Sequence, residues 1–124
     1  VSGNTTVVLS SDEFPLTSIT LAEVLATSDV PSGVVNILTG KKAELIGHLG
    51  KHMDVNAIYL GDKKSPYAES LQLEAVENLK RIKISKENDW EKSTVENPYV
   101  IADFMEGKTT WHPIEIITGS GSGY

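Results

Sequence analysis

His48 and His52 are the residues whose type and spacing most directly suggest metal chemistry. They lie four positions apart on a predicted helix, as two zinc ligands do when they share one helical face. No glutamate follows His48, and neither a cysteine nor an obvious third ligand lies nearby in the sequence. Because two histidines alone do not close a metal site, we predict no metal there, with His48 on the helix surface and His52 near the helix end.

Cysteine chemistry is excluded outright, because the chain contains no cysteine. There is therefore no disulfide framework, no thiolate zinc site and no cysteine nucleophile within these 124 residues.

A glycine-rich run at residues 119–123 follows an apolar run at 114–117, as a phosphate-binding loop follows a strand. Such a loop needs a helix whose N-terminus meets the phosphate, and only Tyr124 follows this one. We therefore predict a flexible Gly/Ser tail over residues 118–124.

Isolated acidic and aromatic residues are the remaining candidates for chemistry or binding. Solvated surface acids are the commoner case, and tryptophans more often pack than bind ligands, although an exposed tryptophan would favour a partner surface. We predict surface positions for the acids Glu13, Glu23, Asp62 and the Asp89/Glu91 pair. We predict packing roles for Trp90 and Trp111.

Length and charge limit the class of protein. A chain of 124 residues suits one domain with a core of its own. Eleven basic against seventeen acidic residues give a formal charge of −6, which opposes binding to nucleic acid and to anionic membranes. No apolar run approaches the length of a membrane span, and the first residues lack the pattern of a signal peptide. We predict a cytoplasmic protein with neither nucleic-acid nor membrane partners.

The elements that must position any site alternate between strand and helix. Residues 34–38 form a short apolar run bounded by Gly33 and Gly40, which fits a strand covered on both faces. Further strands are predicted at 6–9, 55–60 and 81–85. This alternation predicts an α/β fold, three-layered, with a mostly parallel sheet and right-handed crossovers in a Rossmann-like arrangement.

The predicted helices connect these strands. An amphipathic helix is expected at about 18–28, a second from just after Gly40 to about Met53, and a third from the Ser65–Pro66 pair to about Lys80. In the third helix, Glu77 and Arg81 are spaced as a favourable ion pair. A short helix is expected at 98–106, and extended segments at 109–111 and 114–117.

These residues resemble a segment of the aldehyde dehydrogenase superfamily. The likeness covers GNTTVVLSSDEFPL at 3–16, LAEVL at 21–25, GVVNILTG at 33–40 and HMDVNAI at 52–58, in the family order and spacing. AVENLKRI at 75–82 is similar to the helix before the family's catalytic-base strand, and KTTWHP at 108–113 looks like the end of half-length members. The resemblance implies a partial cofactor-binding α/β domain over residues 1–117.

Departures from the family pattern fall on the chemical residues. The family's ribose-binding lysine and glutamate align with Leu9 and Asp12. The family's Phe-Thr-Gly-Ser, which approaches the cofactor pyrophosphate, aligns with residues 60–63, where Asp62 would repel a pyrophosphate. The general-base glutamate aligns with Ser85, and the cysteine that attacks the aldehyde is absent together with its domain.

The resemblance and its departures together imply a non-catalytic aldehyde dehydrogenase-like domain that acts as an interaction or structural subunit. No catalytic residue is predicted, and only Ser11 and Asp12 remain as cofactor-binding candidates. No cofactor is expected, with at most weak binding of NAD(P). The expected partner is a second copy, in a homo-oligomer, or a full-length aldehyde dehydrogenase-like subunit.

Two alternatives remain open from the sequence. The chain would be part of a working NAD(P)-dependent aldehyde oxidoreductase if its catalytic domain lies on another chain or was removed. Alternatively, the chain would bind a different nucleotide at the place where the family binds its cofactor.

Overall fold

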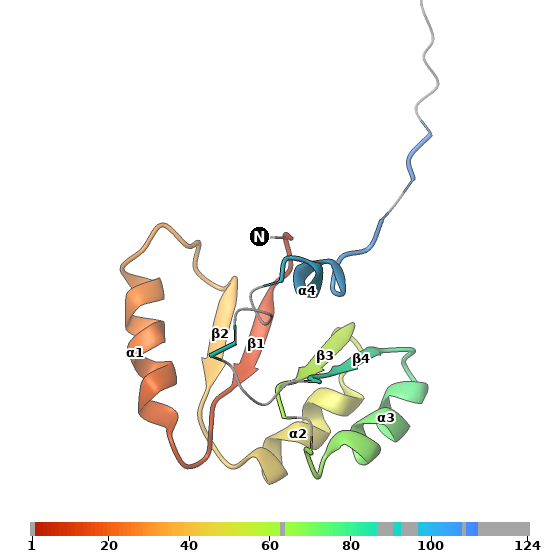
Figure 1. The fold of residues 1–124 in the computed structure, drawn as a ribbon, viewed down its shortest axis with the longest axis horizontal. Coiled ribbons are helices and arrows are strands. Elements are labelled where there is room, and N and C mark those ends of the chain that lie inside the picture. Colours follow the sequence, from red (N-terminus) through yellow and green to blue (C-terminus); the bar gives the residue numbers. More distant parts are fainter. Residues whose placement is uncertain (1, 63, 87–90, 93–96, 108, 112–124) are drawn as a thin grey trace, which may run out of the picture.

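The computed structural model describes residues 2–62, 64–86, 91–92, 97–107 and 109–111. Strands and helices alternate along most of this chain (Figure 1). The elements are β1 (Thr6–Leu9), α1 (Pro15–Ala26), β2 (Val35–Leu38), α2 (Lys42–Lys51), β3 (Ala57–Leu60), α3 (Ala68–Val76), β4 (Arg81–Ile84) and α4 (Tyr99–Ala102).

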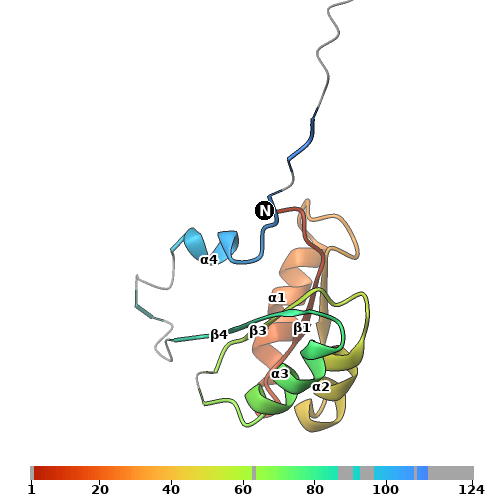
Figure 2. The ribbon, with the colours of Figure 1, turned by 90° about the vertical axis from the view of Figure 1, so that its right-hand side faces the viewer.

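All four strands pair in parallel, which confirms the predicted α/β class. In the described residues they form two sheets of two strands, with Thr6 opposite Val35 in one and Ala57 opposite Arg81 in the other. The sheets lie next to each other, and β1 and β3 are the strands that face one another (Figure 1). Helices α2 and α3 lie on one side of the β3–β4 sheet and α4 on the other (Figure 2).

The apolar core lies between α2, α3 and the second sheet. Among the described residues, the buried apolar side chains are Leu60, Leu71 and Ala75. Gly50 of α2 is buried against α3, and a Cβ atom placed there would lie 3.0 Å from Leu71 Cδ2. The two helices therefore approach closely because this position carries no side chain.

Helix α1 differs from the predicted amphipathic helix. It begins at Pro15, whose fixed φ suits the first helical turn, and ends at Ala26. Its partner among the described elements is β2, yet it contains no buried residue. Several large apolar side chains of this helix are exposed: Leu16, Ile19, Leu21 and Val24.

Helix α3 ends at Val76, earlier than predicted. Three residues later Leu79 adopts a left-handed conformation with φ of +51°, which a continuing right-handed helix does not allow. The predicted Glu77–Arg81 ion pair is wrong, because Arg81 lies in β4 and its Nη1 donates instead to the carbonyl oxygen of Asp103, at 3.0 Å.

The segment containing α4 is held across the second sheet. The Phe104 ring meets that of Tyr59 edge to face at 5.7 Å, and the Asp103 carboxylate pairs with Lys83 at 2.8 Å. Asn4 Nδ2, just before β1, donates to the carbonyl oxygen of Phe104 at 3.0 Å. This segment therefore joins the two sheets, although its helix is shorter than the predicted 98–106.

None of the helices in the described residues combines the length and the apolar composition of a membrane span. The predicted tail at 118–124 and the extended segment at 114–117 lie outside the described residues.

Candidate functional site

The carboxyl ends of the parallel strands are where open α/β sheets bind ligands. Ser10 directly follows β1, is 3% exposed and donates its backbone N–H to the carbonyl oxygen of Leu38, at 3.0 Å. Among the described residues, its hydroxyl oxygen finds no hydrogen-bond partner. The end of β1 therefore holds a buried polar group whose desolvation is not compensated there.

Asp12, one of the two predicted cofactor-binding residues, caps a helix. Its carboxylate oxygens accept the backbone N–H of Lys42, the first residue of α2, at 3.1 and 3.3 Å. Lys41, at the usual capping position, makes no side-chain cap. The loop after β1 thus supplies the acceptor that the N-terminus of α2 requires.

Ser11, the other predicted cofactor-binding residue, is engaged within its own loop. Its hydroxyl accepts the backbone N–H of Phe14 at 3.2 Å, just before α1 begins at Pro15. The structure therefore brings Ser11 and Asp12 together in one loop, and each accepts a hydrogen bond from a backbone amide that starts a helix.

The loop after β3 makes its own contacts. Asp62 Oδ1 accepts the backbone N–H of Lys64 at 2.9 Å, and its carbonyl oxygen accepts that of Ser65 at 3.2 Å. Within the described residues, no hydrogen bond or ion pair joins Asp62 to Asp12. Ser85, after β4, is buried and donates its backbone N–H to the Leu60 carbonyl oxygen at 2.8 Å.

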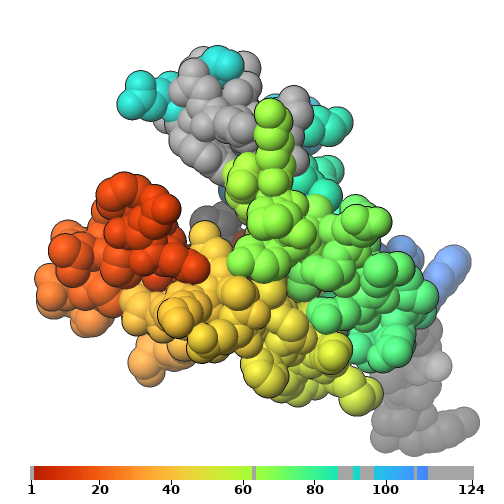
Figure 3. Space-filling model, turned by 90° about the horizontal axis from the view of Figure 1, so that it is seen from below, coloured from red at the N-terminus to blue at the C-terminus, as the bar shows by residue number. Residues whose placement is uncertain are grey.

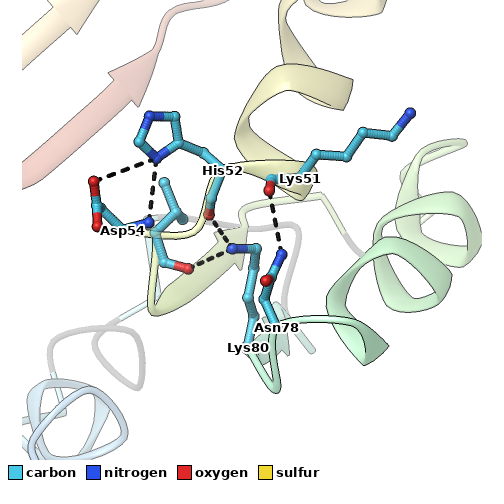
Figure 4. Close-up of polar contacts among 6 residues, drawn as sticks. Lys51, His52, Asp54, Asn78 and Lys80 are labelled. Carbon is cyan, nitrogen blue, oxygen red and sulfur yellow. Dashed lines mark hydrogen bonds and ion pairs between the residues drawn. The ribbon is translucent and has the colours of Figure 1, made fainter.

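His48 and His52 lie at the C-terminal end of α2. His52 Nδ1 accepts the backbone N–H of Asp54 at 3.2 Å and lies 3.9 Å from its carboxylate (Figure 4). In the described part of the chain, no group of three histidine, aspartate or glutamate side chains could hold a metal ion. The His52 side chain therefore accepts a hydrogen bond within the turn that follows α2.

Lys80 is a structural residue that the sequence analysis missed. The Lys80 residue is only 8% exposed. Its ammonium group donates to the carbonyl oxygens of His52 and Val55, and the distance from Nζ to the Val55 oxygen is 2.8 Å (Figure 4). Asn78 Nδ2 also donates to the Lys51 carbonyl oxygen, at 3.2 Å. Two side chains from the turn after α3 thus satisfy carbonyl groups at the end of α2. The sequence feature that could have indicated this role is the position of Lys80 between a predicted helix and a predicted strand.

The predicted surface residues lie mostly where expected. The described acids Glu13, Glu23, Asp62 and Glu91 are exposed, and Asp89 lies outside the described residues. Trp111 is 91% exposed, so its predicted packing role is wrong within the described chain, whereas Trp90 lies outside it.

The class defined by this geometry is a parallel α/β unit in which strands alternate with helices and the strands pair in parallel. A model of the aldehyde dehydrogenase family matches residues 1–85, and the chain belongs to that family.

Curated relatives match about half to two thirds of the chain. An "Aldehyde dehydrogenase, mitochondrial" of Leishmania tarentolae is 33% identical over 82 residues, 66% of this chain and 16% of the relative. The 2-hydroxymuconic semialdehyde dehydrogenase of Pseudomonas sp. (strain CF600) is 47% identical over 57 residues, 45% of this chain and 12% of that protein. Malonate-semialdehyde dehydrogenase 2 of Bacillus anthracis is 37% identical over 81 residues, 64% of this chain and 16% of that protein. The matched region is thus about a sixth or less of these relatives.

Proposed function

We propose that this chain is a non-catalytic aldehyde dehydrogenase-like domain that acts as an interaction or structural subunit. Its membership of the family supplies the scaffold, and the absence of cysteine removes the nucleophile that the family resemblance implies. Ser85 stands where that resemblance places a general-base glutamate, and a serine hydroxyl does not take up a proton at neutral pH.

The observation that carries this proposal is the hydrogen bond between Asp12 and the first amide of α2. A carboxylate committed to a helix N-terminus is not available to a ribose hydroxyl unless the cap is given up, which costs about 1 kcal/mol. Leu9 supplies no ammonium group, and Asp62 opposes a pyrophosphate. We therefore propose that NAD(P) binds weakly at most, and that no step of catalysis passes through it.

Calorimetric titration with NAD⁺ and NADP⁺ tests this proposal. We expect no binding in the low-micromolar range, and Leu9→Lys should strengthen binding by about tenfold, as one charge-assisted contact does. Leu38→Lys is the matched control, since Leu38 lies opposite Leu9 on the neighbouring strand and should bring no gain. A low-micromolar dissociation constant for the unchanged chain would contradict the proposal.

The proposed role is association, either with a second copy or with a full-length aldehyde dehydrogenase-like subunit. Its support is the number of large apolar side chains left in contact with water, Trp111 and Leu16 among them. We further propose a cytoplasmic location without nucleic-acid or membrane partners, since a formal charge of −6 disfavours polyanions. Turnover of any aldehyde by the purified chain would overturn the non-catalytic role.

A second candidate is a piece of a working NAD(P)-dependent aldehyde oxidoreductase. The observation in its favour is that the matched region spans only 12–16% of these dehydrogenases. Intact-mass measurement of the native protein separates the two candidates. A product with the mass of this chain alone supports the non-catalytic subunit, and a much larger product containing a cysteine supports the oxidoreductase.

A further inference from the structure

Helix α1 carries a single charged side chain, Glu23, among its twelve residues. A helix on the surface of a globular protein ordinarily turns a charged face to water, and a helix that is apolar on all sides is ordinarily covered. Here Leu16 is 78% exposed and Val24 58%. Helix α1 therefore exposes large apolar side chains to water while carrying few charges.

Leu16, Thr20 and Val24 form one stripe along this side, at positions i, i+4 and i+8. The Thr20 hydroxyl donates back to the Leu16 carbonyl oxygen at 3.1 Å, so it directs its proton into the helix. Leu21 and Phe14 flank the stripe and are also exposed. We call these five residues the α1 outer face, a surface that offers a partner apolar contact and few hydrogen bonds.

The chain segment that contains α1 carries charged side chains of one sign only. Residues 1–40 contain no lysine, arginine or histidine, and their acids are Asp12, Glu13, Glu23 and Asp29. These acids lie immediately before α1, on it and shortly after its end. In the space-filling view, α1 forms one end of the molecule, away from α3 (Figure 3).

Two copies of this face would bring acids of the same sign together, so charge disfavours a symmetric pairing of α1 with α1. A partner whose apolar surface is flanked by basic groups complements both the stripe and the acidic residues of the segment that contains it, Glu23 of α1 among them. We propose that the α1 outer face docks a partner helix that is apolar along one stripe and flanked by lysine or arginine. This inference rests on the proposed interaction role and names the chemistry of the partner.

The probe for this surface is a pair of synthetic helical peptides with the same leucine stripe. One peptide carries lysines beside the stripe, and the other carries glutamates at the same positions. By fluorescence polarisation we expect the lysine peptide to bind at least about tenfold more tightly than the glutamate peptide, and less tightly as salt is raised. Equal binding of the two peptides would overturn the inference.

A pair of matched variants separates docking on α1 from general attraction to an acidic protein. Leu16→Asp with Val24→Asp adds two negative charges to the α1 outer face, and Leu73→Asp with Val76→Asp adds the same two to exposed positions of α3. Docking on α1 predicts that affinity for the lysine peptide falls about tenfold in the first variant and is unchanged in the second. General attraction predicts that both variants bind the lysine peptide more tightly, which would contradict the proposal.

Amide chemical-shift mapping of the unchanged chain provides a readout that does not depend on how the variants fold. Lysine-peptide binding should shift the amide resonances of Phe14 and of residues 16–26, and shifts confined to α3 would overturn the inference. These measurements do not involve NAD(P). Tight NAD(P) binding would thus refute the proposed function alone, whereas equal peptide binding would refute the docking surface alone.

Discussion

Leu79 pairs an unfavourable backbone conformation with a side chain that contributes little packing. Its φ is +51° and it is 91% exposed. A non-glycine residue in the left-handed region costs about 1–2 kcal/mol, part of which glycine loses again through the greater freedom of the unfolded chain. We expect Leu79→Gly to raise the free energy of unfolding by about 0.5–1 kcal/mol in urea titrations.

Leu73→Gly is the control for that experiment. Leu73 is 70% exposed but lies inside α3, where glycine costs about 1 kcal/mol relative to good helix formers. The two substitutions should therefore change stability in opposite directions. Destabilisation by both would show that the left-handed turn at Leu79 is not strained.

Ser10 and Ser11 are neighbours with opposite hydrogen-bonding states. The buried Ser10 hydroxyl oxygen has no partner among the described residues, whereas the Ser11 hydroxyl accepts the Phe14 N–H. We expect Ser10→Ala to stabilise the chain by about 1 kcal/mol and Ser11→Ala to destabilise it by a similar amount. Thermal unfolding followed by circular dichroism measures both, and a destabilised Ser10→Ala variant would indicate an unrecognised partner for that hydroxyl.

At the scale of elements, the C-terminal end of α2 depends on a side chain from the turn between α3 and β4. The Lys80 ammonium group satisfies two carbonyl groups while its stem lies buried. Lys80→Met retains most of the stem packing but loses the charged donor, so we expect a loss of about 1.5–3 kcal/mol in the free energy of unfolding. Lys51→Met, at an exposed position in α2, should cost less than about 1 kcal/mol. Similar losses for the two variants would rule out a capping role for Lys80.

The sequence predicted the elements better than their contacts. Strand and helix types followed from apolar spacing, because β1, β2 and β4 are short β-branched or apolar runs between turn residues. The end of α3 was missed because Lys80 reads locally as a good helix former, while its side chain is required at α2, a contact that no local pattern encodes. Asp12 was predicted as a cofactor ligand from the family resemblance, and that prediction stays untested; its bond to Lys42, thirty positions away, is likewise a contact that no local pattern encodes.

At the scale of the molecule, buried apolar surface is scarce relative to exposed apolar surface. The described core contains Leu60, Leu71 and Ala75, whereas side chains such as Val76 and Met53 lie largely in water. We expect self-association through exposed apolar residues outside the α1 outer face. Because copies of a chain with a formal charge of −6 repel one another, added salt should strengthen this association.

Light scattering across a hundredfold dilution measures this association, with the average mass falling as the sample is diluted. Repeating the series at higher salt should move the transition to lower protein concentration. A constant monomer mass at every concentration and salt level would exclude a homo-oligomer and leave a different protein as the partner.

The contact between Asn4 and Phe104 joins positions that are 100 residues apart along the chain. Each two-stranded sheet pairs residues separated by far shorter stretches, such as Ala57 with Arg81. Closing a longer loop costs more chain entropy, and long-range contacts slow folding. We therefore expect the local strand–helix–strand units to form early in folding, and the contact between Asn4 and the segment containing α4 to form late.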